Sequence, residues 1–267
     1  MDADVIIYSS VGPHVSTWDD TKPLGGTEKG LLVLKRALEG RGVKVLLEGP
    51  PANGLPVWKR SRALIINRWS EVPRWLNTGR LVHFVGDKEP ERMGHLVGAS
   101  NVYVSEWQHQ RANHVPGDKV IYPLIDDDVL ALADLQLPKE KGRWIYASSF
   151  NKGLDATLDA WHRADQKMDL VVTNTYSDRP TRDLEGARWL GISTPYQLAR
   201  HIAISEGMFF YNTYEECFPV VVAIAKLMRC KAVLGCVGHE PCGVAEAASV
   251  TLDKKLQTDQ WMGVLGL

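Results

Sequence analysis

The sequence has no excess of charge of either sign, no long apolar run and only four cysteines in 267 residues. Its 31 basic and 32 acidic side chains nearly cancel, so the formal net charge is -1. General nucleic-acid-binding proteins carry a basic excess, and we therefore expect no nucleic acid as a partner. No apolar stretch reaches the roughly 20 residues of a transmembrane helix, so we expect no transmembrane segment. Residues 1–4 lack the features of a secretory signal, so we expect a cytoplasmic protein.

The four cysteines lie in the C-terminal third, at Cys217, Cys230, Cys236 and Cys242, with His239 among them. Structural zinc sites usually contain two close pairs of ligands separated by two to four residues, and this spacing does not provide them. Buried thiols in a reducing compartment are the simpler interpretation, and we predict no bound metal.

Alternating strand and helix patterns indicate an α/β protein. Strands are expected at residues 5–8, 43–47, 63–66, 81–85 and 101–104, with a helix from Thr27 that ends before Gly40 and Gly42. After a charged, proline-containing segment at 135–143, strands are expected at 143–147, 170–172, 207–211 and 232–234, with helices at 154–164, 195–204 and around Ile224. The pattern predicts two Rossmann-like lobes with parallel sheets, residues 1–138 and 139–267.

Ligands of open α/β sheets bind beyond the carboxyl ends of the strands, where three loops are notable. In the first loop, Gly25 and Gly26 precede a helix whose free N–H groups favour an anion, although an ordinary glycine-rich turn has the same appearance. In the second, Ser149 and Lys152 precede a helix, and the lysine is either a phosphate ligand or a solvated side chain. The third follows the strand at 207–211.

This third loop carries the residues Tyr214, Glu215, Glu216, Phe218 and Pro219. A carboxylate here can accept hydrogen bonds from sugar hydroxyls, and backbone N–H groups at the next helix start can face phosphates. Either glutamate can instead be a helix-start residue favoured by the helix dipole. We prefer the ligand-binding interpretation for Glu216 over Glu215.

Taken in order, the three loops resemble the donor site of nucleotide-sugar-dependent glycosyltransferases of the GT-B fold, in glycosyltransferase family 4 (group 1). Lys152-Gly153-Leu154 is similar to the basic residue and Gly-Leu of that family, and Glu216 to the first glutamate of its E-x7-E pattern. The second glutamate falls on Ile224, and the chain is short for the family. The segment that begins at Gly191 resembles the loop of that family that lies near the nucleotide base.

The resemblance implies transfer of a hexose or pentose from a nucleoside-diphosphate sugar, such as a UDP- or GDP-sugar, to a hydroxyl of a glycan or other acceptor. It implies no bound metal and no cofactor besides the sugar nucleotide. The implied donor-binding residues are Gly25, Gly26, Ser149, Lys152, Gly191, Tyr214, Glu215, Glu216, Phe218 and Pro219.

In this family the acceptor lies on the first lobe. His83 and Asp87 flank the end of an expected strand, and either is a candidate general base if the reaction inverts configuration. A retaining reaction needs no such base, because the leaving phosphate accepts the proton. Asp87 can also be a loop-capping residue. With Glu216, these are the candidate catalytic residues.

Two other functions remain open. A nucleotide-sugar epimerase shares the GT-B architecture but acts on one substrate, and a non-catalytic module for sugar nucleotides or glycans is compatible with Ile224 in place of glutamate. A dinucleotide dehydrogenase is disfavoured, because no Gly-x-Gly-x-x-Gly follows the first strand. The sugar, base, acceptor and stereochemistry are not determined by the sequence.

Overall fold

The computed structural model describes residues 1–9, 25–50, 57–67, 73–86, 98–112, 116–164, 168–175, 184, 186–238 and 243–267. The chain divides into two compact units. Unit 1 contains residues 1–9, the described part of 30–124, and 251–267, and unit 2 contains residues 25–29 and the described part of 125–250. None of the helices in the described residues has the length and apolar character needed to cross a bilayer.

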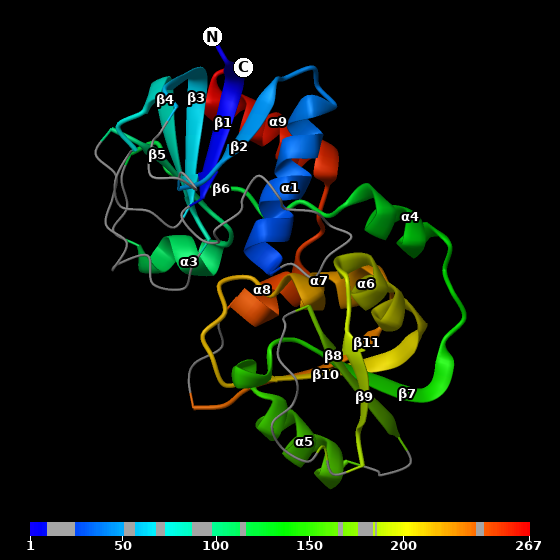
Figure 1. The fold of residues 1–267 in the computed structure, drawn as a ribbon. Coiled ribbons are helices and arrows are strands. Elements are labelled where there is room, and N and C mark those ends of the chain that lie inside the picture. Colours follow the sequence, from blue (N-terminus) through cyan, green and yellow to red (C-terminus); the bar gives the residue numbers. More distant parts are fainter. Residues whose placement is uncertain are drawn as a thin grey trace. The chain divides into compact units, whose positions relative to one another are not determined.

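The described strands of unit 1 form a six-stranded sheet in the order β2-β1-β3-β4-β5-β6, and all of its pairs are parallel (Figure 1). The strands are β1 (Ala3–Ser9), β2 (Val45–Glu48), β3 (Lys59–Asn67), β4 (Leu76–Val85), β5 (Ser100–Tyr103) and β6 (Lys119–Val120). The strands expected at the start of the chain are confirmed. The clearest are β1 and β3, whose apolar runs are buried on both faces of the sheet.

Successive side chains of β1 enter two different cores. Val5 and Ile7 pack in the larger core together with helices α1 (Gly26–Glu39) and α9 (Lys254–Leu265), whereas Ile6 and Tyr8 pack on the opposite face of the sheet. This alternation follows from the two-residue period of a strand. The helix α3 (Glu106–Arg111), which begins at the N-cap Ser105, follows β5 in the chain.

The division of the chain differs from the expected boundary after residue 138 in two respects. Residues 125–138 group with unit 2, because α4 (Asp127–Asp134) packs against α6 (Pro195–Ile204). Residues 251–267 return to unit 1. The sequence provides no local signal for either event, since both depend on contacts between segments far apart in the chain.

Helix α9 is anchored to unit 1 by both apolar and polar contacts. Trp261, Val264 and Leu265 are buried in the larger core of that unit, and the Trp261 ring lies 5.9 Å from the Phe84 ring. The side-chain amide of Gln257 donates to the carbonyl of Tyr122 at 2.9 Å and to that of Pro123 at 3.2 Å. The last helix therefore completes the core of the unit that begins the chain.

The described strands of unit 2 form a five-stranded parallel sheet in the order β11-β10-β7-β8-β9. The strands are β7 (Glu140–Ala147), β8 (Asp169–Asn174), β9 (Arg188–Ile192), β10 (Ser205–Asn212) and β11 (Lys231–Cys236). β9 was not among the expected strands, and Gly191 within it was placed in a loop, because the run Arg-Trp-Leu-Gly is short and half-exposed at the sheet edge. The other four strands were expected, so the predicted pair of parallel sheets is confirmed.

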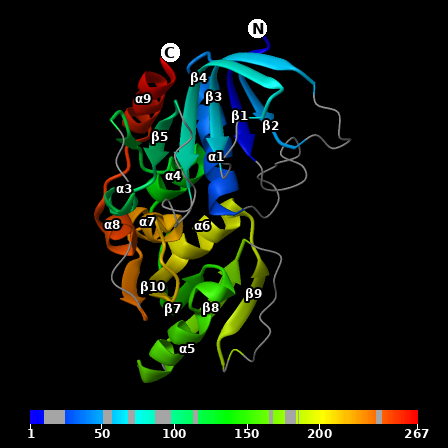
Figure 2. The ribbon, with the colours of Figure 1, turned by 90° about the vertical axis from the view of Figure 1, so that its left-hand side faces the viewer.

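Helices cover both faces of the sheet of unit 2. α5 (Leu154–Arg163) lies on one face, while α6, α7 (Val220–Leu227) and α8 (Gly243–Ser249) lie on the other (Figures 1 and 2). α6 begins as expected, because Thr194 and Gln197 form a reciprocal capping box and Pro195 occupies the first turn. The two helix layers cover the faces of the sheet and not the ends of its strands.

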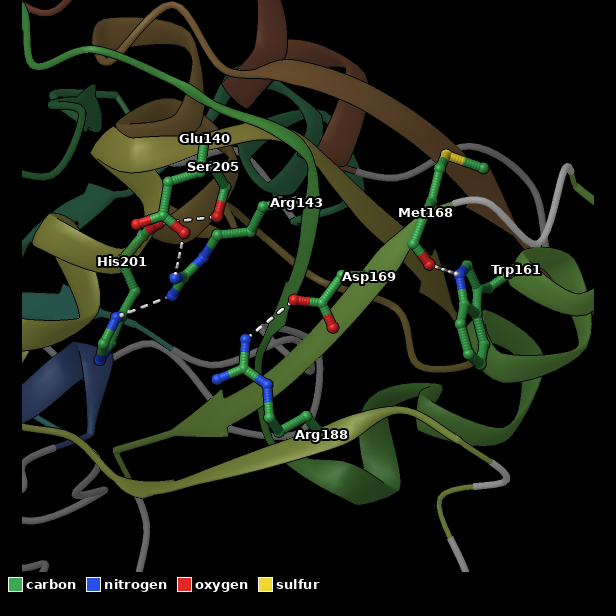
Figure 3. Close-up of polar contacts among 8 residues, drawn as sticks. All are labelled: Glu140, Arg143, Trp161, Met168, Asp169, Arg188, His201 and Ser205. Carbon is green, nitrogen blue, oxygen red and sulfur yellow. Dashed lines mark hydrogen bonds and ion pairs between the residues drawn. The ribbon is translucent and has the colours of Figure 1, made fainter.

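A cluster of charged side chains lies at the amino end of this sheet (Figure 3). Arg143, in β7, is 8% exposed; its Nη1 donates to Glu140 Oε2 at 2.7 Å, and its Nη2 lies 3.2 Å from His201 Nδ1. Because a guanidinium only donates, the imidazole Nδ1 accepts, so His201 is neutral with its proton on Nε2. Nearby, Arg188 pairs with Asp169 at 2.8 Å.

Acidification is expected to destabilise the protein through His201. Burial lowers the pKa of His201 below its ordinary value of 6.5, and Arg143, Arg200 and Arg188 lower it further, against the opposing effect of Glu140. The contribution of His201 to stability is therefore complete above pH 6.5, and is lost as the pH falls below 6.5 towards the pKa of the folded state.

Thermal unfolding of the wild type and of His201→Gln, followed from about pH 8 to pH 5, measures this contribution. We expect the melting temperature of the wild type to fall more steeply below pH 6.5 than that of the variant. Parallel curves would contradict the assignment to His201.

Candidate functional site

The carboxyl ends of β7 and β10, neighbouring strands of unit 2, bring two of the predicted side chains together. Lys152 ends the short 3₁₀ turn η2 (Phe150–Lys152) after β7, and Glu216 lies in the loop after β10. The ammonium of Lys152 forms an ion pair with Glu216 Oε1, and the two side chains are only 26% and 14% exposed. A cation and a carboxylate thus lie in contact at a half-buried site.

The position of Lys152 is set by close packing between the two loops. The N–H of Thr213, after β10, donates to the Lys152 carbonyl at 3.2 Å. The next residue, Gly153, has φ +122°, and a Cβ there would overlap the carbonyl oxygen of Tyr211. Glycine is therefore required at 153 both for its backbone conformation and for the close approach to β10.

A compact turn after β10 orients Tyr214. The side chain of Asn212 accepts from the Tyr214 N–H at 3.0 Å and donates to the Tyr214 carbonyl. The Lys152 ammonium lies 5.6 Å from the centre of the Tyr214 ring, which is 36% exposed. Tyr214 therefore lies beside the ion pair, and Glu215 is half-buried in the same loop.

The start of α8 packs against the loop that carries Glu216. The Gly243 N–H donates to the Glu216 carbonyl at 2.9 Å, and a Cβ at Gly243 would overlap the Cys217 carbonyl. Phe218 is buried, and Pro219 is the N-cap residue of α7. The backbone around Glu216 is consequently fixed on both sides.

Ile224 is buried on α7 and is 8% exposed. At the position where the E-x7-E pattern has its second glutamate, this chain therefore packs an apolar side chain into unit 2. No carboxylate reaches a ligand from position 224.

Gly191 lies near the carboxyl end of β9, and Ser149 follows β7, as Lys152 does. Gly191, in β9, has φ +92°, and its carbonyl accepts from the Thr173 hydroxyl at 2.8 Å. Ser149 Oγ donates to Asn151 Oδ1 at 2.8 Å. Because β8 lies between β7 and β9 in the sheet, Gly191 is two strands away from Lys152 along this edge.

Gly25 and Gly26 lie at the start of α1, and Gly26 is its first residue. A Cβ at Gly26 would meet nothing within 4 Å, so the position is open. In the same first turn, Lys29 forms an ion pair with Asp126 at 2.5 Å. Asp126 is the N-cap residue of α4, which identifies the Asp126-Asp127-Asp128 run as a helix start.

The two candidate bases differ in what the structure shows. His83, in β4, is 1% exposed, and its Nδ1 lies 3.2 Å from Asn101 Oδ1. Asn101 in turn donates to Asp118 at 2.8 Å. This burial favours a structural role for His83 over proton transfer to an acceptor. Asp87 lies outside the described residues.

Among the described residues, no group of three or more His, Cys, Asp or Glu side chains is arranged to hold a metal ion. Cys242 and His239 lie outside the described part of the chain. Burial raises the pKa of the Cys230 thiol to about 11, so this cysteine stays protonated at neutral pH. That fits the expectation of a buried, unreactive thiol for Cys230.

Two residues near these loops, Tyr146 and Gly243, were not predicted from the sequence. Tyr146 lies in the run that predicts β7, where an aromatic residue is ordinary strand composition. Gly243 was unremarkable because its role depends on the approach of Cys217, which is distant in sequence.

No family model matches the chain, and no curated protein matches it in sequence. Solved structures do match. AviGT4, a glycosyltransferase involved in avilamycin A biosynthesis, aligns with a TM-score of 0.63 at 17% identity, over 98% of this chain and 88% of its own. Anabaena Alr3699/HepE in complex with UDP aligns with a TM-score of 0.58 at 14% identity, over 98% and 99% of the two chains.

A glycosyltransferase from Rickettsia africae aligns with a TM-score of 0.59 at 12% identity, over the whole of this chain and 94% of its own. The class that these similarities define is a fold class: two parallel α/β units with the GT-B architecture. More particularly, this chain shares its fold with the glycosyltransferases AviGT4 and that of Rickettsia africae, which confirms the fold class that the sequence predicted. At such low identity the comparison establishes the fold alone.

Proposed function

We propose that this protein is a glycosyltransferase that moves a hexose or pentose from a nucleoside-diphosphate sugar to a hydroxyl of a glycan or other acceptor. The observation that supports this most strongly is the ion pair between Lys152 and Glu216 at the carboxyl ends of β7 and β10. These are the two types of side chain that a sugar nucleotide requires, one for its diphosphate and one for its sugar. HepE, with the same fold, has been solved with UDP and with UDP-glucose.

Lys152 would bind the diphosphate and stabilise the negative charge that grows on it as the glycosidic bond breaks. The N-terminus of α5, which begins at the next residue but one, adds free N–H groups and a favourable dipole. Glu216 would accept hydrogen bonds from hydroxyls of the donor sugar and orient it. The leaving diphosphate or a general base would receive the acceptor proton.

The reaction would need no metal and no cofactor besides the donor, because Lys152 and helix N-termini neutralise the diphosphate. The ribose would be recognised without a carboxylate from position 224, where Ile224 is buried.

Saturation-transfer NMR with a panel of UDP-, GDP- and dTDP-sugars tests the proposal, and hydrolysis is read from the same samples. A selective signal from one donor, followed by transfer to an acceptor, would support it. Conversion of the donor into another sugar nucleotide would indicate an epimerase instead. Binding without transfer to any acceptor or hydrolysis would indicate a binding module, and no binding at all would refute a sugar-nucleotide site.

Glu216→Gln is expected to have opposite effects on the nucleotide and on the donor. UDP should bind about 2- to 5-fold more tightly, because its diphosphate no longer has to break the ion pair between Lys152 and Glu216. A partly exposed pair of this kind contributes about 1 kcal/mol or less. Turnover of the UDP-sugar should fall at least tenfold, because the amide replaces a carboxylate that accepts from the sugar. Isothermal titration and transfer assays measure the two effects.

Glu206→Gln is the matched control. Glu206 pairs with Lys231 at 3.0 Å where β10 and β11 begin, at the other end of the sheet. It should change neither UDP affinity nor turnover. A parallel loss of UDP and UDP-sugar binding in Glu216→Gln would show that Glu216 supports the loop rather than the sugar.

A further inference from the structure

Tyr146 lies at the carboxyl end of β7, directly below the loop that carries Lys152. The side chain is 1% exposed and packs against Leu154 and Leu158 of α5. Its hydroxyl donates to the carbonyl of Ser149 at 2.7 Å. A single aromatic side chain therefore joins the buried strand to the backbone of the loop.

We propose that Tyr146 is a positioning residue for donor binding: its hydroxyl holds the 148–152 loop so that the Lys152 ammonium is in place for the diphosphate. This proposal rests on the proposed function, since it assigns Tyr146 to the same nucleotide-sugar site.

Two hydrogen bonds link the loop to residues of β7 and of the segment after β10, one near each end of the loop. At its start, the Tyr146 hydroxyl holds the Ser149 carbonyl, and at its end, the Thr213 N–H holds the Lys152 carbonyl. Between them lies the single turn η2, which is too short to be stable by itself. Without the first of these hydrogen bonds, the backbone of the turn loses its link to the β7 side chain, while the Phe150 ring still lies 5.4 Å from the Trp189 ring and the bond from Thr213 remains.

The hydroxyl is well suited to this role because it remains a donor at every ordinary pH. Burial raises the pKa of Tyr146, and the negative charges of Glu216 and Asp155 raise it further, against a hydrogen bond with Ser148 that lowers it. Tyr146 lies close to the proposed site, because its hydroxyl bonds to the loop that ends at Lys152. Its position makes the hydroxyl part of the support for Lys152, not a group that contacts the substrate.

Tyr146→Phe removes the hydroxyl and keeps the ring in the core. The loss of one hydrogen bond of about 1 kcal/mol should weaken UDP affinity about 5-fold and raise KM for the donor by a similar factor. The value of kcat should change less. Amide hydrogen exchange in residues 149–153 should become faster, whether or not a nucleotide is present.

A double-mutant cycle shows whether Tyr146 acts through Lys152. In the Lys152→Met background, Tyr146→Phe should have no further effect on UDP affinity, because the group that it positions is absent. Additive effects would overturn the proposal. Unchanged affinity and unchanged exchange in Tyr146→Phe would overturn it as well.

Tyr103→Phe is the matched control. Tyr103 is also 1% exposed, and its hydroxyl lies 3.4 Å from Asp118 in unit 1. This variant should leave UDP affinity and exchange in residues 149–153 unchanged. If the wild type binds no nucleotide, the proposed function fails, but faster exchange in Tyr146→Phe would still show that the hydroxyl orders the loop.

Discussion

Lys152→Met should reduce kcat/KM for sugar transfer by about 100-fold or more while the protein remains folded. Loss of one preorganised electrostatic contact to a developing charge has an effect of this size. The side chain is 26% exposed and its ion partner Glu216 is 14% exposed, so water screens the charge only in part. Methionine keeps most of the length of the side chain. Steady-state kinetics with a saturating acceptor measure the loss.

Lys231→Met provides the control for charge removal. Lys231 is 69% exposed, pairs with Glu206 and begins β11, at the amino end of the same sheet. Water screens an exposed pair of this kind, so both transfer and stability should stay nearly unchanged. Equal activity in Lys152→Met and Lys231→Met would remove Lys152 from the phosphate site.

Gly153→Ala is expected to lower the stability of the protein by about 3 kcal/mol or more. The added Cβ overlaps the Tyr211 carbonyl, and φ of +122° is strained for alanine. The melting temperature should therefore fall by roughly 6 to 12 °C. Because the residue adjoins Lys152, any folded fraction should also lose UDP affinity. Thermal unfolding followed by circular dichroism gives the first quantity.

Gly42→Ala separates the overlap from the backbone strain. Gly42 also has a positive φ, of +79°, but a Cβ there would meet nothing within 4 Å. This variant should lower the free energy of unfolding by about 1 kcal/mol, which is the effect of the backbone strain alone. If Gly153→Ala were no worse than Gly42→Ala, the close approach between β10 and the Lys152 loop would not be a stabilising feature of unit 2.

The parallel sheets could be predicted because a buried strand can be recognised from its own short apolar run of residues. Val5 to Tyr8 and Leu170 to Val172 are continuous apolar runs, as strands covered on both faces must be. The edge strand β9 lacks such a run and was missed. The return of α9 was also missed, since the burial of Trp261 depends on Phe84, which is remote in the chain.

For the candidate site, local motifs pointed to Lys152 and Glu216 because each lies just beyond a predicted strand, and their roles stay predictions. Their pairing could not be derived, because it requires that β7 and β10 be neighbours although β8 and β9 separate them in the chain. The burial of His83 was equally inaccessible, since a strand residue faces either a core or the solvent depending on the helices that cover it.

The return of α9 to unit 1 bears on how the chain folds during its synthesis. Unit 1 contributes the first strand, but its core lacks Trp261, Val264 and Leu265 until the last helix has left the ribosome. Most of unit 2 is one continuous segment, residues 125–250, and can fold before that. The half of the protein that is translated first is therefore completed last, and its unfinished apolar face is the part that a nascent-chain chaperone would have to cover.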